Sequence, residues 1–134
     1  DAYSHRIMGY HLATDLEAVS SLEALHMALA HADVPEGLIH HSDRGVQYCS
    51  HKYVELLQKH GIRISMTENG DPLENAVAER VNGILKDEFF LDQCFLDLKQ
   101  ARKAAADAVR IYNFKRLHVS LGYKTPDVVF KSVA

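Results

Sequence analysis

The segment "GLIHHSD", residues 37–43, is followed at once by "RGVQYCS", residues 44–50. The first predicts a buried β-strand that ends at Asp43, and the second predicts a loop, because the apolar run stops and Gly45 follows closely. An Asp in this place either closes a turn with Gly45 or offers its carboxylate to a ligand. In open α/β sheets, ligand sites lie outside the carboxyl ends of the strands. The choice depends on whether a second acidic residue is placed to act with Asp43.

Upstream of this segment the sequence predicts a strand and then a helix. Residues 5–13 have the composition of a short strand, and residues 14–32 have helical periodicity. Thr14 lies three residues before Glu17, which is the spacing of a capping box at a helix N-terminus. One apolar face of this helix is formed by residues spaced at i, i+4, i+7 and i+11: Ala18, Leu22, Leu25 and Leu29.

Downstream, residues 51–60 predict a helix with Ser50 as its N-cap, and Gly61 suits the left-handed position after its last turn. Residues 62–66 alternate apolar and polar side chains, which predicts a strand with one polar face. Residues 67–72 predict a loop. Strands that alternate with helices indicate an α/β fold with at least one pair of parallel strands.

A long helix is predicted after this loop, with Asp71 as N-cap, Pro72 at its first position and Glu74 completing a capping-box-like spacing. Its apolar side is formed by Leu73, Val77, Val81 and Ile84. At about 100° per residue, a polar stripe lies on the opposite side and consists of Asn75, Glu79, Asn82 and Lys86. Glu79 is therefore a candidate partner for Asp43.

A strand-end Asp and a helix Glu are the oxygen ligands that Mg²⁺ prefers, and two such ions about 3.5–4 Å apart support phosphoryl transfer. The chain has 18 Asp and Glu residues, however, so a pair at this separation is expected by chance. By spacing alone, the favoured interpretation is structural: Asp43 closes a turn and Glu79 is a solvated helix residue.

Composition predicts one globular domain spanning residues 1–134, since 47% of the residues are hydrophobic and no apolar run approaches the length of a membrane span. Cys49 and Cys94 lack CxxC spacing and predict free thiols in a reducing cytoplasm. Residues 1–96 contain 7 Lys and Arg against 15 Asp and Glu, whereas residues 97–134 contain 8 against 3. The basic helix and tail from about residue 97 indicate either a polyanionic partner or a solvated basic face, and charge alone favours the solvated face.

Histidines near Asp43 raise the alternative of a zinc site. His40 and His41 are adjacent on the predicted strand, with His51 further along. Neighbouring residues of a strand point to opposite faces, so His40 and His41 do not easily bind one ion. The expectation is one histidine in the core and one beside the site, without zinc.

Three longer motifs favour the metal-site interpretation of Asp43 and Glu79 over the structural one. They are "HSDRGVQYCS" (residues 41–50), "NGDPLENAVAERVNGILKDEF" (69–89) and "YNFKRLHVSLGYKTP" (112–126). In type, order and spacing they resemble the motifs of bacterial insertion-sequence transposases whose catalytic core is similar to retroviral integrase, the DDE class with an RNase H-like fold. The resemblance extends over about residues 1–130. The third motif marks the end of this transposase type through Tyr112, Asn113, Arg116, His118, Leu121, Gly122, Thr125 and Pro126.

The resemblance implies that Asp43 and Glu79 are the second and third acidic residues of a catalytic triad and bind Mg²⁺, with Mn²⁺ as a substitute. It implies metal-dependent phosphoryl transfer on DNA, with cleavage of element ends followed by strand transfer during DNA integration. Contacts to DNA are expected from Arg44, Asn75, Asn82 and Lys86. The expected protein is a cytoplasmic, nucleoid-associated bacterial homo-oligomer that binds element ends and target DNA, with no membrane partner.

The sequence departs from the family pattern at the first triad Asp, which is expected on a central strand upstream of residues 1–10. Asp1 matches a different family position. Residues 1–134 are therefore expected to be an N-terminally truncated core without its first central strand, catalytically inactive, and prone to pair the exposed edge of residues 37–43 with another chain. The alternatives are an RNase H-like nuclease, since fold does not fix the reaction, and a non-catalytic nucleic-acid-binding remnant.

Overall fold

The computed structural model describes residues 1–13, 18–31, 33–67 and 76–133. The chain forms two compact units, which are described separately. The strand unit spans Met8–Ala76, and the tail unit combines Asp1–Ile7 with Val77–Ala134. That residues 1–134 make one domain stays a prediction.

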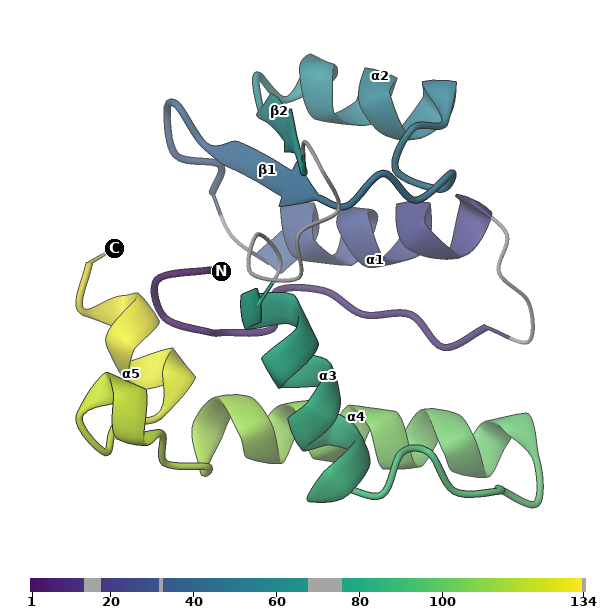
Figure 1. Ribbon diagram of the computed structural model, residues 1–134, viewed down its shortest axis with the longest axis vertical. Helices are drawn as coiled ribbons and strands as arrows, with labels where there is room; N and C mark the ends of the chain where they lie inside the picture. Colours follow the sequence, from purple (N-terminus) through teal and green to yellow (C-terminus); the bar gives the residue numbers. More distant parts are fainter. Residues whose placement is uncertain (14–17, 32, 68–75, 134) are drawn as a thin grey trace. The chain divides into compact units, whose positions relative to one another are not determined.

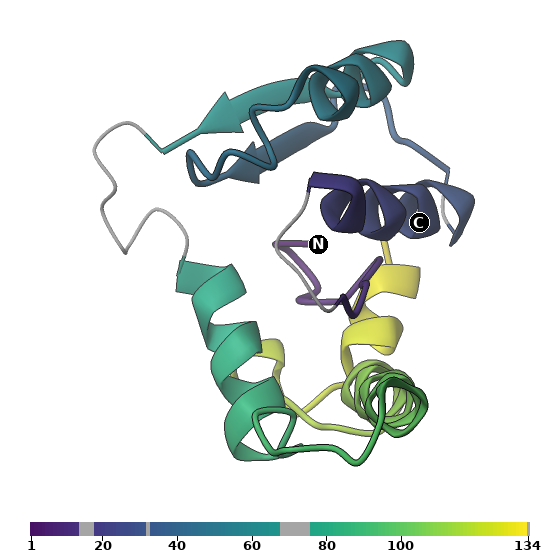
Figure 2. The ribbon, with the colours of Figure 1, turned by 90° about the vertical axis from the view of Figure 1, so that its right-hand side faces the viewer.

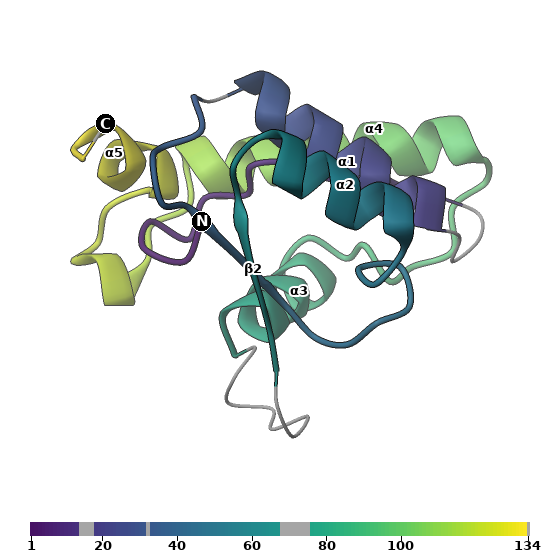
Figure 3. The same cartoon turned by 90° about the horizontal axis from the view of Figure 1, so that it is seen from above.

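The strand unit contains a two-stranded parallel sheet, with β1 (Ile39–Ser42) paired to β2 (Arg63–Met66) (Figure 1). In the register, Ile39 lies opposite Arg63 and Ser42 lies opposite Met66. Helix α1 (Ala18–His31) precedes β1, and helix α2 (His51–Lys59) connects the two strands. The two helices lie alongside one another (Figure 3). The parallel pair and its connecting helix confirm the α/β prediction.

The core of the strand unit forms where α1, α2 and the start of β2 meet. Its fully buried members are Leu25, Tyr53, Leu57 and Ile62, and residues packed against them include Leu22, Leu29 and Ile64. The predicted leucine face of α1 and the apolar side of residues 62–66 are therefore confirmed. Gly61, with φ 68°, follows the last turn of α2 in the left-handed region, as predicted, and lets the chain enter β2 directly.

Residues 5–13 do not form the predicted strand. Beyond Met8 this segment passes close to α1: a Cβ on Gly9 would lie 2.0 Å from the Ala24 carbonyl oxygen. Strand propensity needs a neighbouring backbone to be realised, and residues 5–13 have no ladder partner within the described part of the chain. The close approach to α1 explains why position 9 requires glycine.

Strand β1 is less buried than its apolar sequence predicts. Leu38 and Ile39 are 37% and 50% exposed, because β2 is the only strand paired with β1 among the described residues. Ser50 precedes α2 as predicted but makes no side-chain cap, since its hydroxyl donates to the Gln47 carbonyl instead (2.9 Å). The predicted capping residues Thr14, Glu17, Asp71, Pro72 and Glu74, with Leu73, lie outside the described residues.

The tail unit contains three helices and a short 3₁₀ turn. Helix α3 (Ala76–Asp87) begins at the boundary between the units, and it is followed by α4 (Leu98–Phe114), the 3₁₀ helix η2 (Val119–Leu121) and α5 (Pro126–Lys131). Figure 2 views α4 close to its own axis, with α5 packed beside one end. Helix α4 begins where the Asp97 carboxylate accepts the Gln100 N–H at 2.7 Å. The side that it buries consists of Ala101, Ala105, Ala108, Val109, Tyr112 and Asn113.

Cys49 and Cys94 are free, as predicted, and both are exposed. Among the described residues, no helix is long and apolar enough to cross a bilayer.

Candidate functional site

Asp43 follows β1 directly, at the carboxyl end of the parallel strand pair. Its side chain is exposed, and its Oδ1 accepts the backbone N–H of Gly45 at 2.9 Å. This short-range bond turns the chain at "RG" and explains why the strand stops there. It also fixes the carboxylate at the strand end, where a ligand is expected in this class of sheet. Turn closure and ligand binding are therefore compatible roles for Asp43.

Arg44 ties the ends of the two strands together. Its Nε donates to the carbonyl of Thr67 at 2.7 Å, and Thr67 N–H donates to the Ser42 carbonyl at 3.1 Å, which extends the ladder by one bond. Thr67 is buried, although Arg44 itself is exposed. At least one donor of Arg44 therefore has a structural role, which the sequence did not reveal because the partners are 23 residues apart.

The two histidines of β1 lie on opposite faces, as the strand geometry predicts. His40 lies on the buried side, where its Nε2 and the Tyr53 hydroxyl are 3.0 Å apart, and burial lowers the pKa of His40. Burial also raises the pKa of Tyr53 to about 12. His41 is exposed, with its Nδ1 3.0 Å from the Ser65 hydroxyl. His40 is thus a core histidine.

Glu79 lies in the first turn of α3 and is exposed together with Asn82 and Lys86. Their i, i+3, i+7 spacing places the three side chains on one face, whereas Ile84 is buried at 4% exposure. Of the predicted apolar side, Ile84 is buried and Val81 half-buried, but Val77 is 41% exposed, so the predicted division of this helix into a polar and an apolar side is wrong in its first turn. Asn75, the fourth member of the predicted stripe, lies outside the described residues.

The donor types fit a hard divalent cation. Asp43 and Glu79 supply carboxylate oxygens, and each is exposed within its own unit. The described residues contain no group of three or more His, Cys, Asp or Glu that could hold a metal ion. Carboxylate oxygens are ligands that Mg²⁺ accepts, with water and phosphate oxygens completing its shell.

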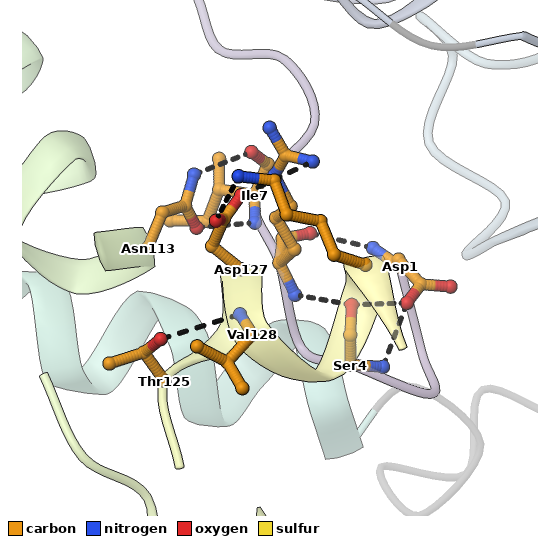
Figure 4. A network of polar contacts seen from close by, with 9 residues as sticks. Asp1, Ser4, Ile7, Asn113, Thr125, Asp127 and Val128 are labelled. Atoms are coloured by element: carbon orange, nitrogen blue, oxygen red, sulfur yellow. Dashed lines mark hydrogen bonds and ion pairs between the residues drawn. The ribbon is translucent and has the colours of Figure 1, made fainter. Parts of the chain in front are cut away.

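The third motif has mainly a structural role. Tyr112 is 1% exposed and stacks edge-on against His118, with ring centroids 4.9 Å apart. Asn113 bonds both ways to the backbone of Ile7: its Oδ1 accepts the N–H and its Nδ2 donates to the carbonyl, each at 2.9 Å (Figure 4). Arg116 forms a bidentate pair with Glu88, in which the Nη2–Oε1 distance is 2.5 Å. These contacts hold the segment 1–7 and the end of α3 to the tail.

The rest of the motif shapes the turn into α5. Gly122 adopts the left-handed conformation (φ 62°), and His118 pairs with Lys124 across the turn. The Thr125 hydroxyl accepts the Val128 N–H at 3.4 Å (Figure 4). Pro126 occupies the first helical position of α5. In the same unit the Asp1 carboxylate accepts bonds from the backbone and hydroxyl of Ser4, which is a turn-forming role.

Comparison with known proteins identifies the family. Two sequence models, both described as integrase core domain, match residues 1–72 and 60–126, so the chain belongs to the integrase core domain family. It is 33% identical to the transposase for insertion sequence element IS629 of Shigella sonnei over 94% of this chain and 42% of that protein. It is 32% identical to the putative transposase InsK for element IS150 of Escherichia coli K12, over 94% of this chain and 44% of that protein. The chain thus spans less than half the length of these relatives.

Solved structures show the same fold. The catalytic core domain of BIV integrase superposes with a TM-score of 0.66 at 22% identity, over 90% of this chain and 76% of that one. A chain of the simian T-cell lymphotropic virus intasome gives a TM-score of 0.70 at 22% identity, over 87% of this chain and 41% of that one. The fold is that of retroviral integrase catalytic cores, the RNase H-like fold that the sequence motifs predict.

Proposed function

We propose that this chain is the catalytic core of a DNA transposase, which cleaves element ends and joins them to target DNA by divalent-metal-dependent phosphoryl transfer. The observation that carries the proposal is that integrase core models match both the first and the second half of the chain. The matched residues include Asp43, at the carboxyl end of a parallel strand, and Glu79, on the exposed face of α3. The relatives named as transposases support the same function.

In the proposed mechanism, Asp43 and Glu79 hold Mg²⁺, with Mn²⁺ as a substitute. When bound, the metal activates the attacking oxygen and stabilises the leaving oxygen of the phosphodiester. The HTLV-2 integrase core, a structural neighbour, was solved with magnesium. The turn from Asp43 to Gly45 keeps one carboxylate oxygen engaged and fixes the orientation of the other. Arg44 supports this geometry through Thr67.

DNA is the proposed substrate, held beside the scissile bond by Lys86, Asn82 and Asn75 and by the remaining donors of Arg44. Lysine, arginine and amide side chains position nucleic acid through its phosphates. The proposed protein is a bacterial, nucleoid-associated homo-oligomer of the cytoplasm. Dimeric and trimeric forms of the HTLV-2 integrase core support the oligomer.

The test uses the longest protein whose reading frame contains residues 1–134, with precleaved DNA ends and a target plasmid in Mg²⁺. Asp43→Asn and Glu79→Gln should each abolish joining, since an amide is a poor ligand for a hard cation. Matched controls are Asp33→Asn and Glu23→Gln, which change exposed acids elsewhere in the strand unit and should leave joining unchanged.

Three outcomes separate the alternatives. Cleavage of DNA without joining would indicate a nuclease of this fold instead. Binding of DNA without cleavage in any divalent metal would indicate a non-catalytic remnant. Joining that survives both site substitutions would refute the assignment of Asp43 and Glu79.

A further inference from the structure

The exposed side of α4 carries four cations, which we call the α4 cationic stripe. Its members are Lys99, Arg102, Lys103 and Arg110, all exposed. At about 100° per residue they fall within an arc of roughly 100°, and Arg102, at one edge of this arc, shares its side of the helix with Val109 and Asn113, which are buried about two to three turns further along. The rise of 1.5 Å per residue makes the stripe about 16 Å long.

The four members of the stripe differ in their ion pairing. Arg110 pairs with Asp107, with Nη2 3.3 Å from Oδ1. Among the residues that the structure describes, no ion pair involves Lys99, Arg102 or Lys103. These three side chains form a compact positive cluster on the first two turns of α4, and Asp107, four residues after Lys103, is the next acidic residue along the helix.

The position of this cluster is unfavourable for the helix. Lys99 lies in the first turn of α4 and meets the positive end of the helix dipole, where an acidic residue would be stabilising. Lys99 and Lys103 are also spaced i, i+4, at which like charges repel. The backbone end itself is already capped by Asp97. These penalties are small for exposed side chains, and an anion bound between Lys99 and Lys103 would offset them.

We propose that the α4 cationic stripe binds backbone phosphates of duplex DNA, as a contact surface additional to the face of α3 that carries Glu79. The inference rests on the proposed function, which makes DNA the substrate. Duplex DNA carries one charge per about 1.7 Å of axis, so a stripe of this length faces several phosphates. Such contacts hold a duplex without selecting its sequence.

Composition favours DNA over an acidic protein as the partner. Protein interfaces have a core enriched in aromatic residues and depleted of charge. Between Lys99 and Arg110 the exposed residues of α4 are the four cations, Gln100 and Ala106, and the acidic Asp107, with its side chain 50% exposed, is paired with Arg110. A surface of this composition matches a polyphosphate.

The test measures binding of the 134-residue chain to a labelled duplex of about 20 base pairs by fluorescence anisotropy, in EDTA, at salt between about 50 and 200 mM. The double variant Lys99→Gln/Lys103→Gln should raise Kd about tenfold at the lowest salt and reduce the slope of log K against log salt by about 2. Adding Arg102→Gln should reduce the slope by about 3 in all. Glutamine keeps helix propensity, so the melting temperature should not fall.

The matched control is Lys52→Gln/Lys59→Gln, which removes two exposed lysines from α2. Equal weakening in the control and stripe variants, or no weakening in either, would overturn the stripe as a DNA contact while leaving the proposed function intact. The same variants are also titrated with poly-L-glutamate. If the stripe variants lose poly-L-glutamate binding but keep duplex binding, the partner of the stripe is an acidic protein and the proposal is overturned. A wild-type 134-residue chain that binds no duplex at any salt would overturn the stripe as a DNA contact, whereas the proposed function is decided separately by the joining assay on the longer protein.

Discussion

The end of β1 and the tail motif contrast sharply, although both carry recognisable family motifs. At the end of β1, Asp43 is exposed and its side chain makes one hydrogen bond, to Gly45 two residues away. In the tail, Tyr112 is 1% exposed and Asn113 makes two bonds to a segment 106 residues distant. The motif at the end of β1 thus leaves a carboxylate exposed to solvent, whereas the tail motif uses its side chains in buried packing and hydrogen bonds.

The difference suggests that the two motifs have different roles, one in ligand binding and the other in holding the fold together. Exposed carboxylates at a strand end contribute little to folding and are available to a ligand. Buried, doubly bonded side chains fix the structure that supports a site, because leaving such groups unpaired is expensive. The four predictions that follow compare the two regions by their effect on stability, from the largest to the smallest.

Replacing Tyr112 should have the largest effect. Tyr112→Ala removes a fully buried aromatic side chain and is expected to lower the free energy of unfolding by about 3–5 kcal/mol, measured by urea denaturation. The control is Tyr123→Ala, which truncates a 68% exposed tyrosine of the same motif and should change stability by less than about 0.5 kcal/mol. Similar losses for the two variants would contradict the structural role of Tyr112.

Asn113→Ala should cost about 2 kcal/mol, since the N–H and the carbonyl of Ile7 both lose their partner in a part-buried place. Urea denaturation measures the loss, and amide hydrogen exchange at Ile7 should speed up. Asn82→Ala, on the exposed face of α3, is the control and should be nearly neutral. Unchanged exchange at Ile7 would argue against the two-way bond.

Acid should destabilise the chain before its carboxylates titrate. Burial first, and then Arg116 and His5, lower the pKa of His118, and burial lowers that of His40. Below about pH 6.5 the unfolded chain therefore binds more protons than the folded one, so stability falls as the pH drops. Arg116 lowers the pKa of Glu88 through its hydrogen bond, so the contribution of Glu88 is lost only at a still lower pH.

The measurement is the melting temperature between about pH 7.5 and pH 5.5. In His118→Gln the dependence on pH should be shallower than in the wild type, whatever its absolute stability. A melting temperature that rises toward about pH 5.5 would mean that acid stabilises the chain, which contradicts a lowered pKa for the buried His118.

Asp43→Asn should have the smallest effect on folding, within about 0.5 kcal/mol by urea denaturation. The asparagine carbonyl can accept the Gly45 N–H as the carboxylate does, so the turn persists. Joining of DNA ends should nevertheless be lost. Asp43→Asn is therefore expected to lose activity and keep stability, whereas Tyr112→Ala is expected to lose stability. A large loss of stability in Asp43→Asn would assign Asp43 to the scaffold.

The sequence by itself determined the elements whose signals are local. The leucine face of α1 and the alternation in β2 depend on periodicities of 3.6 and two residues, and the glycine after α2 is a local signal of a helix end. The three motifs also identified the integrase family and its fold. Within that fold, the place of Asp43 at a strand end followed from the apolar run that precedes it.

Only the tertiary structure decided which side chains meet across the chain. It paired Arg44 with Thr67 and Asn113 with Ile7, and it assigned His40 to the core. It also showed that residues 5–13 form no strand, since a strand requires a partner that local sequence cannot specify. The physical reason is common to all of these: hydrogen bonds and burial depend on groups far apart in sequence, whereas propensity and periodicity depend on neighbours.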